Sequence, residues 1–386
     1  MNFDEIFFHL GEGNPAKDVA GAPPLYQTSN FTFKTVADMA ESLKNEDKIP
    51  FYTRGANPTT QILQQKLAAL EGTEEALVFG SGSAAITAAL VSQVRSGDHI
   101  VCVDNPYGWT KKLIADILHR FGVSCSFIPA ADSQGLINAV QPSTKVIFLE
   151  SPISWTYEMQ DIEMVTAFAK KHSIVTIMDN SCATPLYQQP AKYGVDIIVH
   201  SGTKYLGGHA DMVAGVLCTS KTICQQIFRN EFMTFGGILS PFESWLMIRS
   251  LRTLDMRMER VSNNALKVAD YLSNHPKVAS LLYTHSKHFP QKDLREKYLT
   301  GAGGLMTIDL APNNFKATEK FCNSLTRFKL GCSWGGFESL AFPAVTTMSS
   351  LNYDKPNIMV NRIRLYVGME SSQSLIDDLS NALNSI

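Results

Sequence analysis

The chain has 386 residues, a length that allows two or three domains with a large buried core. Apolar residues make up 45% and charged residues 18% of it, and the formal net charge of -2 gives no reason to expect a nucleic acid or an anionic membrane as partner. This charge balance leads us to expect a small-molecule substrate. No apolar run approaches the roughly 20 residues that a membrane span needs.

The seven cysteines are scattered and include no CxxC pair, which predicts neither a bound metal nor a disulfide framework. We interpret them as small core residues of a protein in a reducing compartment. The first nine residues lack the basic start and the small-residue cleavage site of a secretory signal. The sequence therefore predicts a cytoplasmic protein.

Residues 1–58 are rich in glycine and proline and are predicted to form an arm that wraps over another surface. Residues 59–250 alternate short apolar segments with amphipathic ones, which is typical of a mainly parallel α/β sheet in a large domain. The predicted strands are 76–79, 100–103, 126–128, 146–149, 175–178, 197–199 and 212–217, and the predicted helices are 60–70, 83–94, 110–121 and 162–171.

Residues 251–386 are predicted to form a smaller α/β C-terminal domain, which a long helical stretch at 244–273 joins to the large one. The strands predicted there are 305–310 and 364–367, and the helices are 318–325 and 375–383. Ligands of parallel sheets gather beyond the carboxyl ends of the strands, so we look for functional side chains there.

Lys204 follows the predicted strand 197–199 in the segment Ser201-Gly-Thr203-Lys204. A lysine that bonds covalently to an aldehyde must be neutral, which partial burial favours, and the hydroxyls before it could donate to a phosphate. A solvated turn is the alternative for this segment taken alone.

Asp179 ends the preceding strand, where a carboxylate beside a pyridine nitrogen would keep that nitrogen protonated and make the ring an electron sink. A cap for the next segment is the alternative for Asp179. Tyr107 follows strand 100–103, where its ring could stack on a flat cofactor or pack in a turn.

Gly80-Ser-Gly82-Ser83 lies between a strand and a helix, where backbone N–H groups and the helix dipole form an anion site. The same stretch, continued to Ala85, fits the G-x-G-x-x-G/A dinucleotide fingerprint, and Asp104 ends the next strand. A nicotinamide-dependent dehydrogenase is therefore an open alternative at this point.

Two arginines are candidates for binding anions. Arg54 follows Tyr52 in the arm and could bind a phosphate in forked geometry, or it could be an ordinary surface residue. Arg364 lies on an apolar predicted strand and needs a partner, which could be a substrate carboxylate or the side chain of Glu370.

The order of these motifs resembles that of the Cys/Met-metabolism enzymes, which depend on pyridoxal 5′-phosphate (PLP), from about residue 22 to 370. The most specific parts are Asp179-Asn-x-x-Ala-Thr-Pro185 and the run from Ser201 through Lys204 to His209. The resemblance implies PLP as cofactor and the PLP-dependent transferase fold type I, and it decides against the dinucleotide interpretation.

The resemblance also implies roles at the matching positions. Lys204 would be the Schiff-base lysine, Asp179 the partner of the pyridine nitrogen, and Tyr107 a ring that stacks on the cofactor and assists in catalysis. The phosphate would be held by Gly82, Ser83, Ser201 and Thr203, with Tyr52 and Arg54 from a neighbouring subunit. Arg364 would bind the substrate carboxylate. The enzyme would be a homo-oligomer, typically a tetramer built as a dimer of dimers, whose arm contacts the neighbouring subunit.

Two segments resemble those of bacterial cystathionine β-lyases within this family. Ser154 stands where γ-acting relatives carry asparagine, and Ser333-Trp334 stands where they usually carry Ser-Leu, which suggests that Ser333 and Trp334 bind substrate. Trp109 replaces a cysteine that is usual in methionine γ-lyases. Ser83 departs from a common methionine, which a phosphate contact through the backbone N–H would tolerate.

These comparisons predict a PLP-dependent carbon–sulfur lyase that converts L-cystathionine to homocysteine, pyruvate and ammonia. The alternatives are a γ-acting relative (cystathionine γ-lyase, cystathionine γ-synthase, methionine γ-lyase or O-acetylhomoserine sulfhydrylase) and a non-catalytic member that serves as a scaffold.

Overall fold

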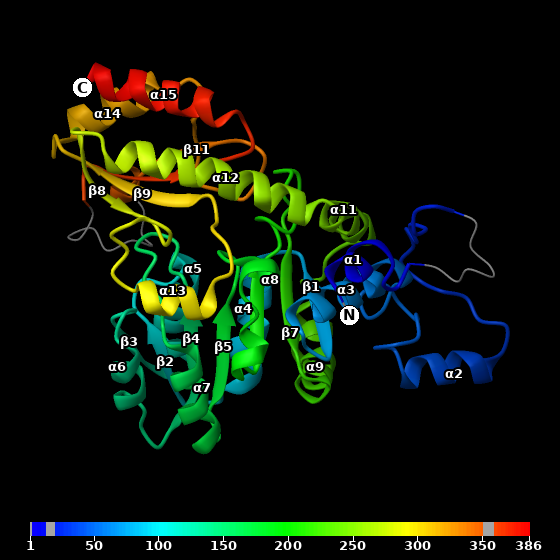
Figure 1. The fold of residues 1–386 in the computed structure, drawn as a ribbon. Helices are drawn as coiled ribbons and strands as arrows, with labels where there is room; N and C mark the ends of the chain where they lie inside the picture. The colour runs from blue at the N-terminus through cyan, green and yellow to red at the C-terminus, as the bar shows by residue number, and fades with distance from the viewer. Residues whose placement is uncertain (1, 13–19, 350–358) are drawn as a thin grey trace.

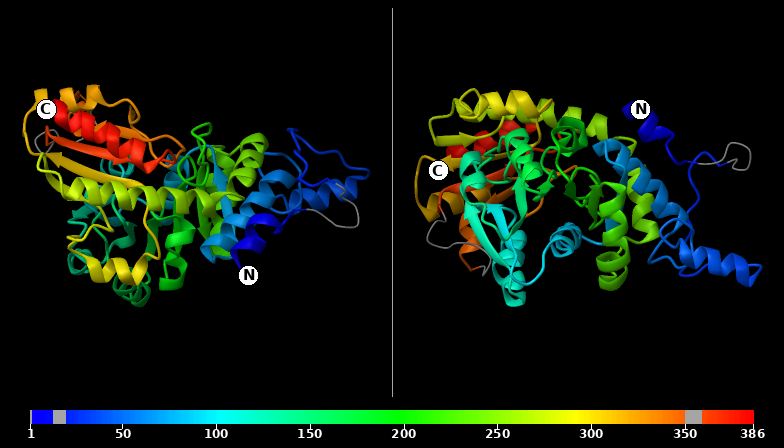
Figure 2. Two further views of the ribbon diagram at one scale, coloured as in Figure 1. Left: turned by 45° about the horizontal axis from the view of Figure 1, so that its top comes forward. Right: turned by 90° about the horizontal axis from the view of Figure 1, so that it is seen from below.

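The computed structural model describes residues 2–12, 20–349 and 359–386. Figure 1 shows a large sheet with its helices, a second sheet with helices above it, and an N-terminal segment that reaches out to one side. The two further views in Figure 2 agree that this segment, which carries α2 (Val36–Lys44), projects away from the rest of the molecule. No helix among the described residues is long and apolar enough to cross a membrane.

The large sheet has seven strands in the order β1-β7-β6-β5-β4-β2-β3. Neighbouring strands from β6 to β3 are parallel, whereas β7 runs antiparallel to both β6 and β1. The strands are β1 (Glu75–Phe79), β2 (His99–Val103), β3 (Ser124–Ile128), β4 (Thr144–Glu150), β5 (Val175–Asp179), β6 (Ile197–Ser201) and β7 (Gly215–Thr219). The predicted mainly parallel sheet is confirmed.

Most of the helices beside this sheet begin at a residue whose side chain caps them. Asn57 accepts a hydrogen bond from the N–H of Thr59 (2.9 Å) at the start of α3, and Gly72 ends that helix in the left-handed conformation. The helices of this part are α3 (Pro58–Glu71), α4 (Gly82–Gln93), α5 (Gly108–Lys112), α6 (Ser133–Asn138), α7 (Ile162–Lys171), α8 (Thr184–Tyr187), α9 (Lys221–Ile227), α10 (Met233–Phe235) and α11 (Pro241–Leu251).

Several boundaries differ from the prediction. The helix predicted at 110–121 consists of the end of α5, the π-helix η1 (Leu113–Ile117) and the 3₁₀ turn η2 (Leu118–Phe121). The other short helical segments are the 3₁₀ segments η3 (Pro190–Tyr193) and η5 (Ala344–Ser349) and the π-helix η4 (Phe228–Phe232). The last strand of the large sheet begins at Gly215 and not at 212.

The helical stretch predicted at 244–273 is two helices, α11 and α12 (Leu254–Ser273). The carbonyl of Ser250 accepts hydrogen bonds from the Thr253 backbone (3.1 Å), the Thr253 hydroxyl (3.2 Å) and Arg257 (3.0 Å). These local bonds compete with the regular helical pattern, and the helix breaks there.

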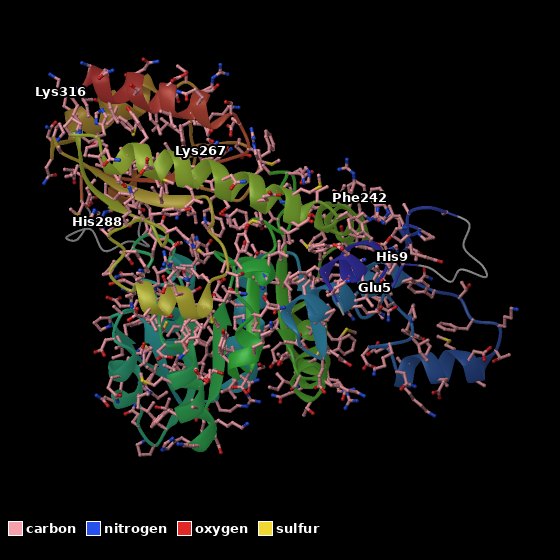
Figure 3. The ribbon with its side chains drawn as sticks, viewed as in Figure 1. Glu5, His9, Phe242, Lys267, His288 and Lys316 are labelled. Carbon is pink, nitrogen blue, oxygen red and sulfur yellow. The ribbon has the colours of Figure 1, made fainter. Side chains whose placement is uncertain are left out.

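The second sheet has five strands in the order β10-β11-β12-β9-β8 and is antiparallel except between β10 and β11. Helix α12 contacts β8 and α15, and α14 contacts β11 and α15, so these helices form one layer over the sheet. Exposed Lys267 on α12 and Lys316 on α14 are labelled on this layer in Figure 3. The remaining elements are β8 (Val278–Leu282), α13 (Lys292–Tyr298), β9 (Leu305–Leu310), α14 (Phe315–Ser324), β10 (Lys329–Leu330), β11 (Leu340–Pro343), β12 (Arg362–Tyr366) and α15 (Ser372–Ser385).

Alternation along these strands divides the buried side chains between two cores. Met306 and Leu365, which are paired across β9 and β12, belong to the core beneath the helix layer. Leu305 and Tyr366 belong to the core that is continuous with the large sheet. Because side chains two residues apart share a face, Arg364 points the same way as Tyr366, toward the large sheet.

The domain boundaries expected at 58 and 250 stay predictions. One hydrophobic core contains residues from both sides of residue 250, so the packing of the core does not mark a boundary there.

The N-terminal helix α1 (Phe3–Phe8) is fixed to α3 by a buried lysine. Lys66 is fully buried, donates to the carbonyls of Ile6 (2.7 Å) and Phe7 (3.2 Å), and pairs with Glu12 (2.9 Å). The charge is thus compensated by three oxygens, which a buried ammonium requires.

Candidate active site

A cavity of about 880 Å³ lies at the carboxyl ends of β4, β5 and β6 and extends to the second sheet. It brings together ten of the twelve site residues expected from the sequence. These are Gly82, Ser83, Tyr107, Asp179, Ser201, Thr203, Lys204, Ser333, Trp334 and Arg364. The carboxyl-end rule for parallel sheets therefore located the cavity correctly.

Asp179 is buried at the end of β5, directly beside Glu150 at the end of β4. Its carboxylate accepts a hydrogen bond from the N–H of Ser181 (2.9 Å). Burial raises the pKa of Asp179, and the hydrogen bonds from Ser181 and the positive charge of Lys204 oppose that rise. A cationic ring nitrogen placed against this carboxylate would remove the cost of burying its charge.

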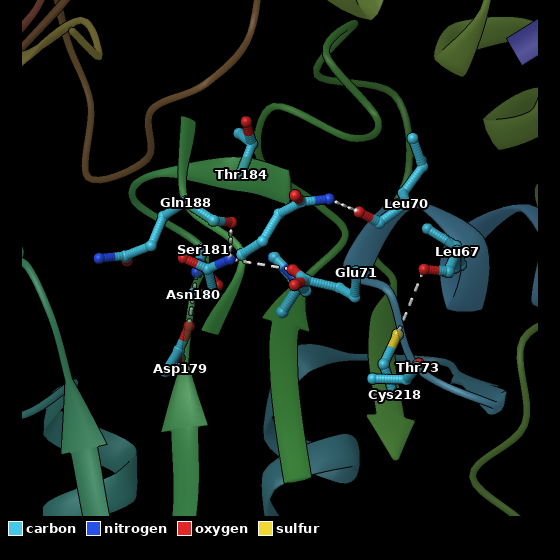
Figure 4. A network of polar contacts seen from close by, with 12 residues as sticks. Leu67, Leu70, Glu71, Thr73, Asp179, Asn180, Ser181, Thr184, Gln188 and Cys218 are labelled. Atoms are coloured by element: carbon cyan, nitrogen blue, oxygen red, sulfur yellow. Dashed lines mark hydrogen bonds and ion pairs between the residues drawn. The ribbon is translucent and has the colours of Figure 1, made fainter. Parts of the chain in front are cut away.

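A polar network holds Asn180, the residue that follows Asp179 (Figure 4). Asn180 donates to the Glu71 carboxylate (2.9 Å) and to the carbonyl of Gln188 (2.9 Å), and His200 donates to the same Glu71 oxygen (2.5 Å). All of these groups are buried, so they hold the end of β5 in one conformation.

Lys204 lies in the turn after β6 and its ammonium contacts the C-terminal part of the chain. Its Nζ donates to the hydroxyl of Ser333 (2.7 Å) and lies 5.4 Å from the ring centre of Trp334. Burial, and then the positive charge of Arg364, lower the pKa of Lys204 to about 8. The amine is therefore easily deprotonated, as a covalent nucleophile must be.

Gly335 allows this contact between distant segments. It has a φ of +85°, and a Cβ atom there would lie 2.8 Å from the carbonyl carbon of Lys204 and 2.7 Å from the nitrogen of Tyr205. Only glycine permits both the left-handed conformation and the close approach of the two backbones.

Groups that could bind an anion lie where α4 begins. The Ser81 side chain caps the helix by accepting from the N–H of Ala84 (3.1 Å), and the first-turn N–H groups of Gly82 and Ser83 have no acceptor within the helix. Gly82 packs on Ser201 so closely that a Cβ would lie 3.0 Å from the Ser201 Cα. The Ser201 hydroxyl, on the cavity wall, is thus next to these N–H groups.

Thr203 also lines the cavity, but its hydroxyl already bonds to the backbone of Ala214. It accepts from the N–H (3.0 Å) and donates to the carbonyl (3.3 Å) of that residue. Donation to a phosphate would require the hydroxyl proton to turn away from Ala214.

Tyr107 and Glu150 are joined at the cavity wall. The N–H of Tyr107 donates to the Glu150 carboxylate (2.7 Å), whose other oxygen accepts from the N–H of Ser154 (3.2 Å). Burial and the nearby charge of Asp179 raise the pKa of Glu150 to about 8. Sequence reasoning gave Glu150 no role, although it ends a strand just as Asp179 does, and the same rule could have found it.

Arg364 is buried on β12 and donates to the carbonyl of Cys332 (2.7 Å). An ion pair with Glu370, the structural alternative, is not formed between these two described residues. Glu370 instead accepts from the N–H and the hydroxyl of Ser339, both at 2.8 Å.

Tyr52 and Arg54, both described, are not among the cavity residues of their own chain. They lie in the projecting N-terminal segment, where Tyr52 pairs with Asn30 in an isolated bridge. The guanidinium carbon of Arg54 is 5.6 Å from the Tyr52 ring centre, and both side chains are exposed.

Trp109 lines the cavity, and its side chain is partly exposed to solvent. This residue was not assigned to the site from the sequence.

The chemistry of these groups fits PLP. A lysine with a lowered pKa suits the aldehyde, a buried carboxylate suits the pyridine nitrogen, and a helix N-terminus with a hydroxyl suits the phosphate. The flat face of Tyr107 and the charge of Arg364 complete a set that can take an amino acid beside the cofactor. Fold and site together define a PLP-dependent enzyme of fold type I.

A family model described as "Cys/Met metabolism PLP-dependent enzyme" matches residues 5–384, and the chain belongs to this family. Its cofactor is PLP, so the match of residues 80–85 to a dinucleotide fingerprint does not indicate a nicotinamide-dependent dehydrogenase. The chain is a PLP-dependent lyase of Cys/Met metabolism.

Curated relatives with different activities are similarly close. A cystathionine γ-lyase of Bacillus subtilis is 34% identical over the whole of both chains. An L-methionine γ-lyase of Pseudomonas putida is 36% identical over 97% of this chain and 96% of its own. A cystathionine β-lyase of Lactococcus lactis is 36% identical over 97% of each chain. Identity alone therefore does not separate β- from γ-elimination.

A solved structure has the same fold. The crystal structure of metB from Corynebacterium glutamicum superposes with a TM-score of 0.91 at 32% identity, covering 100% of this chain and 98% of that one.

Proposed function

We propose that this lyase catalyses β-elimination of L-cystathionine, giving homocysteine, pyruvate and ammonia. The observation that carries the proposal is the contact of Lys204 with Ser333 (2.7 Å) and Trp334 (5.4 Å). The segment Ser333-Trp334, which resembles that of cystathionine β-lyases, thus contacts Lys204, the residue expected to transfer protons to and from the substrate. Ser154, the other residue of that resemblance, also lines the cavity.

Bound PLP would supply an electron sink for the negative charge that develops at the substrate Cα. Asp179 would hold a proton on the ring nitrogen, and the start of α4 with Ser201 would bind the phosphate. Arg364 would bind the substrate carboxylate and so fix the orientation of the Cα–H bond.

Lys204, as a neutral amine, would take the Cα proton of the substrate. Its pKa of about 8 makes this form accessible near neutral pH. Lys204, with help from Tyr107, would then return a proton to the departing thiolate.

We propose γ-elimination as the second candidate, since relatives named for it are as similar as the β-lyase. A steady-state assay with L-cystathionine decides between them by the keto acid formed. Pyruvate with homocysteine supports β-elimination, whereas 2-oxobutyrate with cysteine overturns it. L-cystine and L-methionine as further substrates define the range of leaving groups.

We also propose that a second copy of the chain completes the phosphate site with its Tyr52 and Arg54, in a tetramer built from two such dimers. Both side chains are exposed and outside the cavity of their own chain, and α2 nearby exposes Val36, Met39 and Leu43. Mixing the inactive variants Arg54→Ala and Lys204→Ala tests the dimer. Mixed dimers would regain one intact site, and a mixture with no more activity than its parts contradicts the shared site.

We propose a cytoplasmic location, which is supported by the seven cysteines, all of which are free. Fractionation of cells that express the chain would test it.

A further inference from the structure

We propose that Trp155 and Phe342 form an aromatic clamp that positions Arg364 for the substrate α-carboxylate. The inference rests on the proposed role of Arg364 and adds the two positioning residues that let it act. Trp155 and Phe342 both line the cavity, and neither was assigned to the site from the sequence.

The distances place the arginine in a corner between the two rings. The guanidinium carbon of Arg364 lies 4.9 Å from the ring centre of Trp155 and 5.3 Å from that of Phe342. The ring centres are 5.4 Å apart, with an interplanar angle of 48°. The three centres form a nearly equilateral triangle, so both rings lie within the range of a cation–π contact with the guanidinium.

The two rings come from different sheets. Phe342 lies directly opposite Arg364 in the register of β11 and β12, so both side chains share a face. Trp155 comes from the loop that follows β4 of the large sheet. The clamp therefore connects the arginine of the second sheet to the sheet that carries Asp179 and Lys204.

The backbone next to Trp155 is held in place. The buried carboxylate of Glu150 accepts from the N–H of Ser154 (3.2 Å), and the N–H of Tyr157 donates to the carbonyl of Ile153 (2.9 Å). A ring on a fixed loop restricts the arginine before substrate arrives, which reduces the ordering cost of binding.

The clamp and a hydrogen bond act on the same cation in different ways. The bond to the Cys332 carbonyl (2.7 Å) directs one N–H group, whereas the rings restrain the plane of the guanidinium. The rings also exclude water from one side, which strengthens the attraction between the guanidinium and a carboxylate. Carboxylate recognition should therefore depend on the rings more than other parts of substrate binding do.

The test compares a ligand that has the carboxylate with one that lacks its charge. Dissociation constants of L-alanine and L-alaninamide are measured by calorimetry on the PLP-loaded enzyme, for wild type, Trp155→Leu, Phe342→Leu and Trp155→Phe. We expect each leucine variant to weaken L-alanine binding by about tenfold, within the range of a desolvated cation–π contact, and to change L-alaninamide binding by less than about twofold. Trp155→Phe keeps a ring and should restore most of the affinity.

Phe315→Leu is the matched control, because Phe315 is an exposed aromatic residue of α14 and not among the cavity residues. It should leave both affinities unchanged. Thermal unfolding of each variant shows whether the fold is kept. Equal loss of both ligands, or of neither, in the leucine variants of unchanged melting temperature would overturn the clamp.

The binding test does not depend on the proposed reaction. L-Alanine has no leaving group, so the result is the same whether cystathionine yields pyruvate or 2-oxobutyrate. The variant Arg364→Ala tests separately whether Arg364 binds the substrate carboxylate. If that variant keeps the wild-type ratio of the two dissociation constants, Arg364 does not bind the carboxylate and the clamp fails with it.

Discussion

The two halves of the cavity are fixed in different ways. Asp179, Ser201 and Lys204 follow neighbouring strands of one parallel sheet, so the hydrogen bonds of the sheet set their spacing. Arg364 comes from β12 of the second sheet, and Ser333 and Trp334 come from the segment between β10 and β11. They reach the first half through side-chain contacts and one close backbone approach.

This difference suggests a division of labour. Groups proposed to hold the cofactor lie on the rigid sheet, where their geometry is least affected by change elsewhere. Groups proposed to bind the substrate lie on segments whose contacts can vary without disturbing the sheet. Relatives with different named activities and similar identity are what such a division would produce.

Replacement of Lys204 by alanine should have the largest effect, because it removes the covalent anchor and the proposed proton carrier together. We expect turnover of L-cystathionine to fall by about 10³-fold or more. Release of pyruvate, measured with the coupled dehydrogenase assay, checks this. PLP binding that survives in the variant would show that the other cofactor contacts act independently, and undiminished turnover would contradict the proposed role.

Gly335→Ala should break the contact between the halves, because the new Cβ would clash with the backbone of Lys204 and Tyr205 and the residue would be strained at φ +85°. Overpacking of this kind typically lowers the free energy of unfolding by about 1–3 kcal/mol. We expect denaturant unfolding to detect this loss, together with a raised KM. Gly21→Ala, where no atom lies within 4 Å of the new Cβ, is the control and should change neither.

The pKa of Lys204 predicts how the apoprotein takes up its cofactor with pH. The pKa is about 8, below the usual value, so the ammonium predominates at lower pH and the neutral amine at higher pH. Below pH 8 the reactive fraction falls about tenfold for each pH unit. The rate of PLP attachment, followed by absorbance, should therefore rise from pH 6 and level off above about pH 8. A rate that falls over this range would contradict the assignment.

Ser201→Ala should have the smallest effect and should be confined to the cofactor half. Loss of one hydrogen bond to a phosphate should weaken PLP binding by about fivefold or more, while the KM of the loaded enzyme stays the same. Equilibrium dialysis of the apoprotein measures the first quantity and steady-state kinetics the second. Ser324→Ala, in α14, is the matched control. A change of KM without a change of PLP affinity would contradict the proposed role, because it would mean that Ser201 acts on substrate binding and not on cofactor binding.

The residues expected in both halves line the cavity, apart from Tyr52 and Arg54 of the expected phosphate site, but the sequence did not indicate how Arg364 is held. A strand followed by a polar residue marked Asp179 and Lys204 as candidates, since the carboxyl ends of parallel strands meet at one edge, and the family resemblance gave them their expected roles. Trp155 could not be found in this way. Its contact with Arg364 joins a loop after β4 to a strand some 200 residues later, and no spacing rule connects them.

Local pattern also failed where hydrogen bonds outside the helix compete with helical ones. The stretch at 244–273 has few helix breakers, yet Ser250 bonds to Thr253 and Arg257 and the helix ends there. The antiparallel second sheet was only partly predicted, because β8 is only partly buried, β10 has two exposed residues and β11 has only four residues, so none of them shows a clear apolar alternation.

The amino-acid sequence by itself predicted the parallel sheet and marked the start of α4, Asp179 and Lys204 as candidates that suit PLP, because each is a pattern of residues close together in the chain. Only the tertiary structure decided which segments meet: Gly335 against Lys204, Glu150 beside Asp179, and Trp155 and Phe342 around Arg364. These contacts depend on how two sheets pack. Packing is fixed by the shapes and polar partners of many distant side chains at once, and no local pattern contains that information.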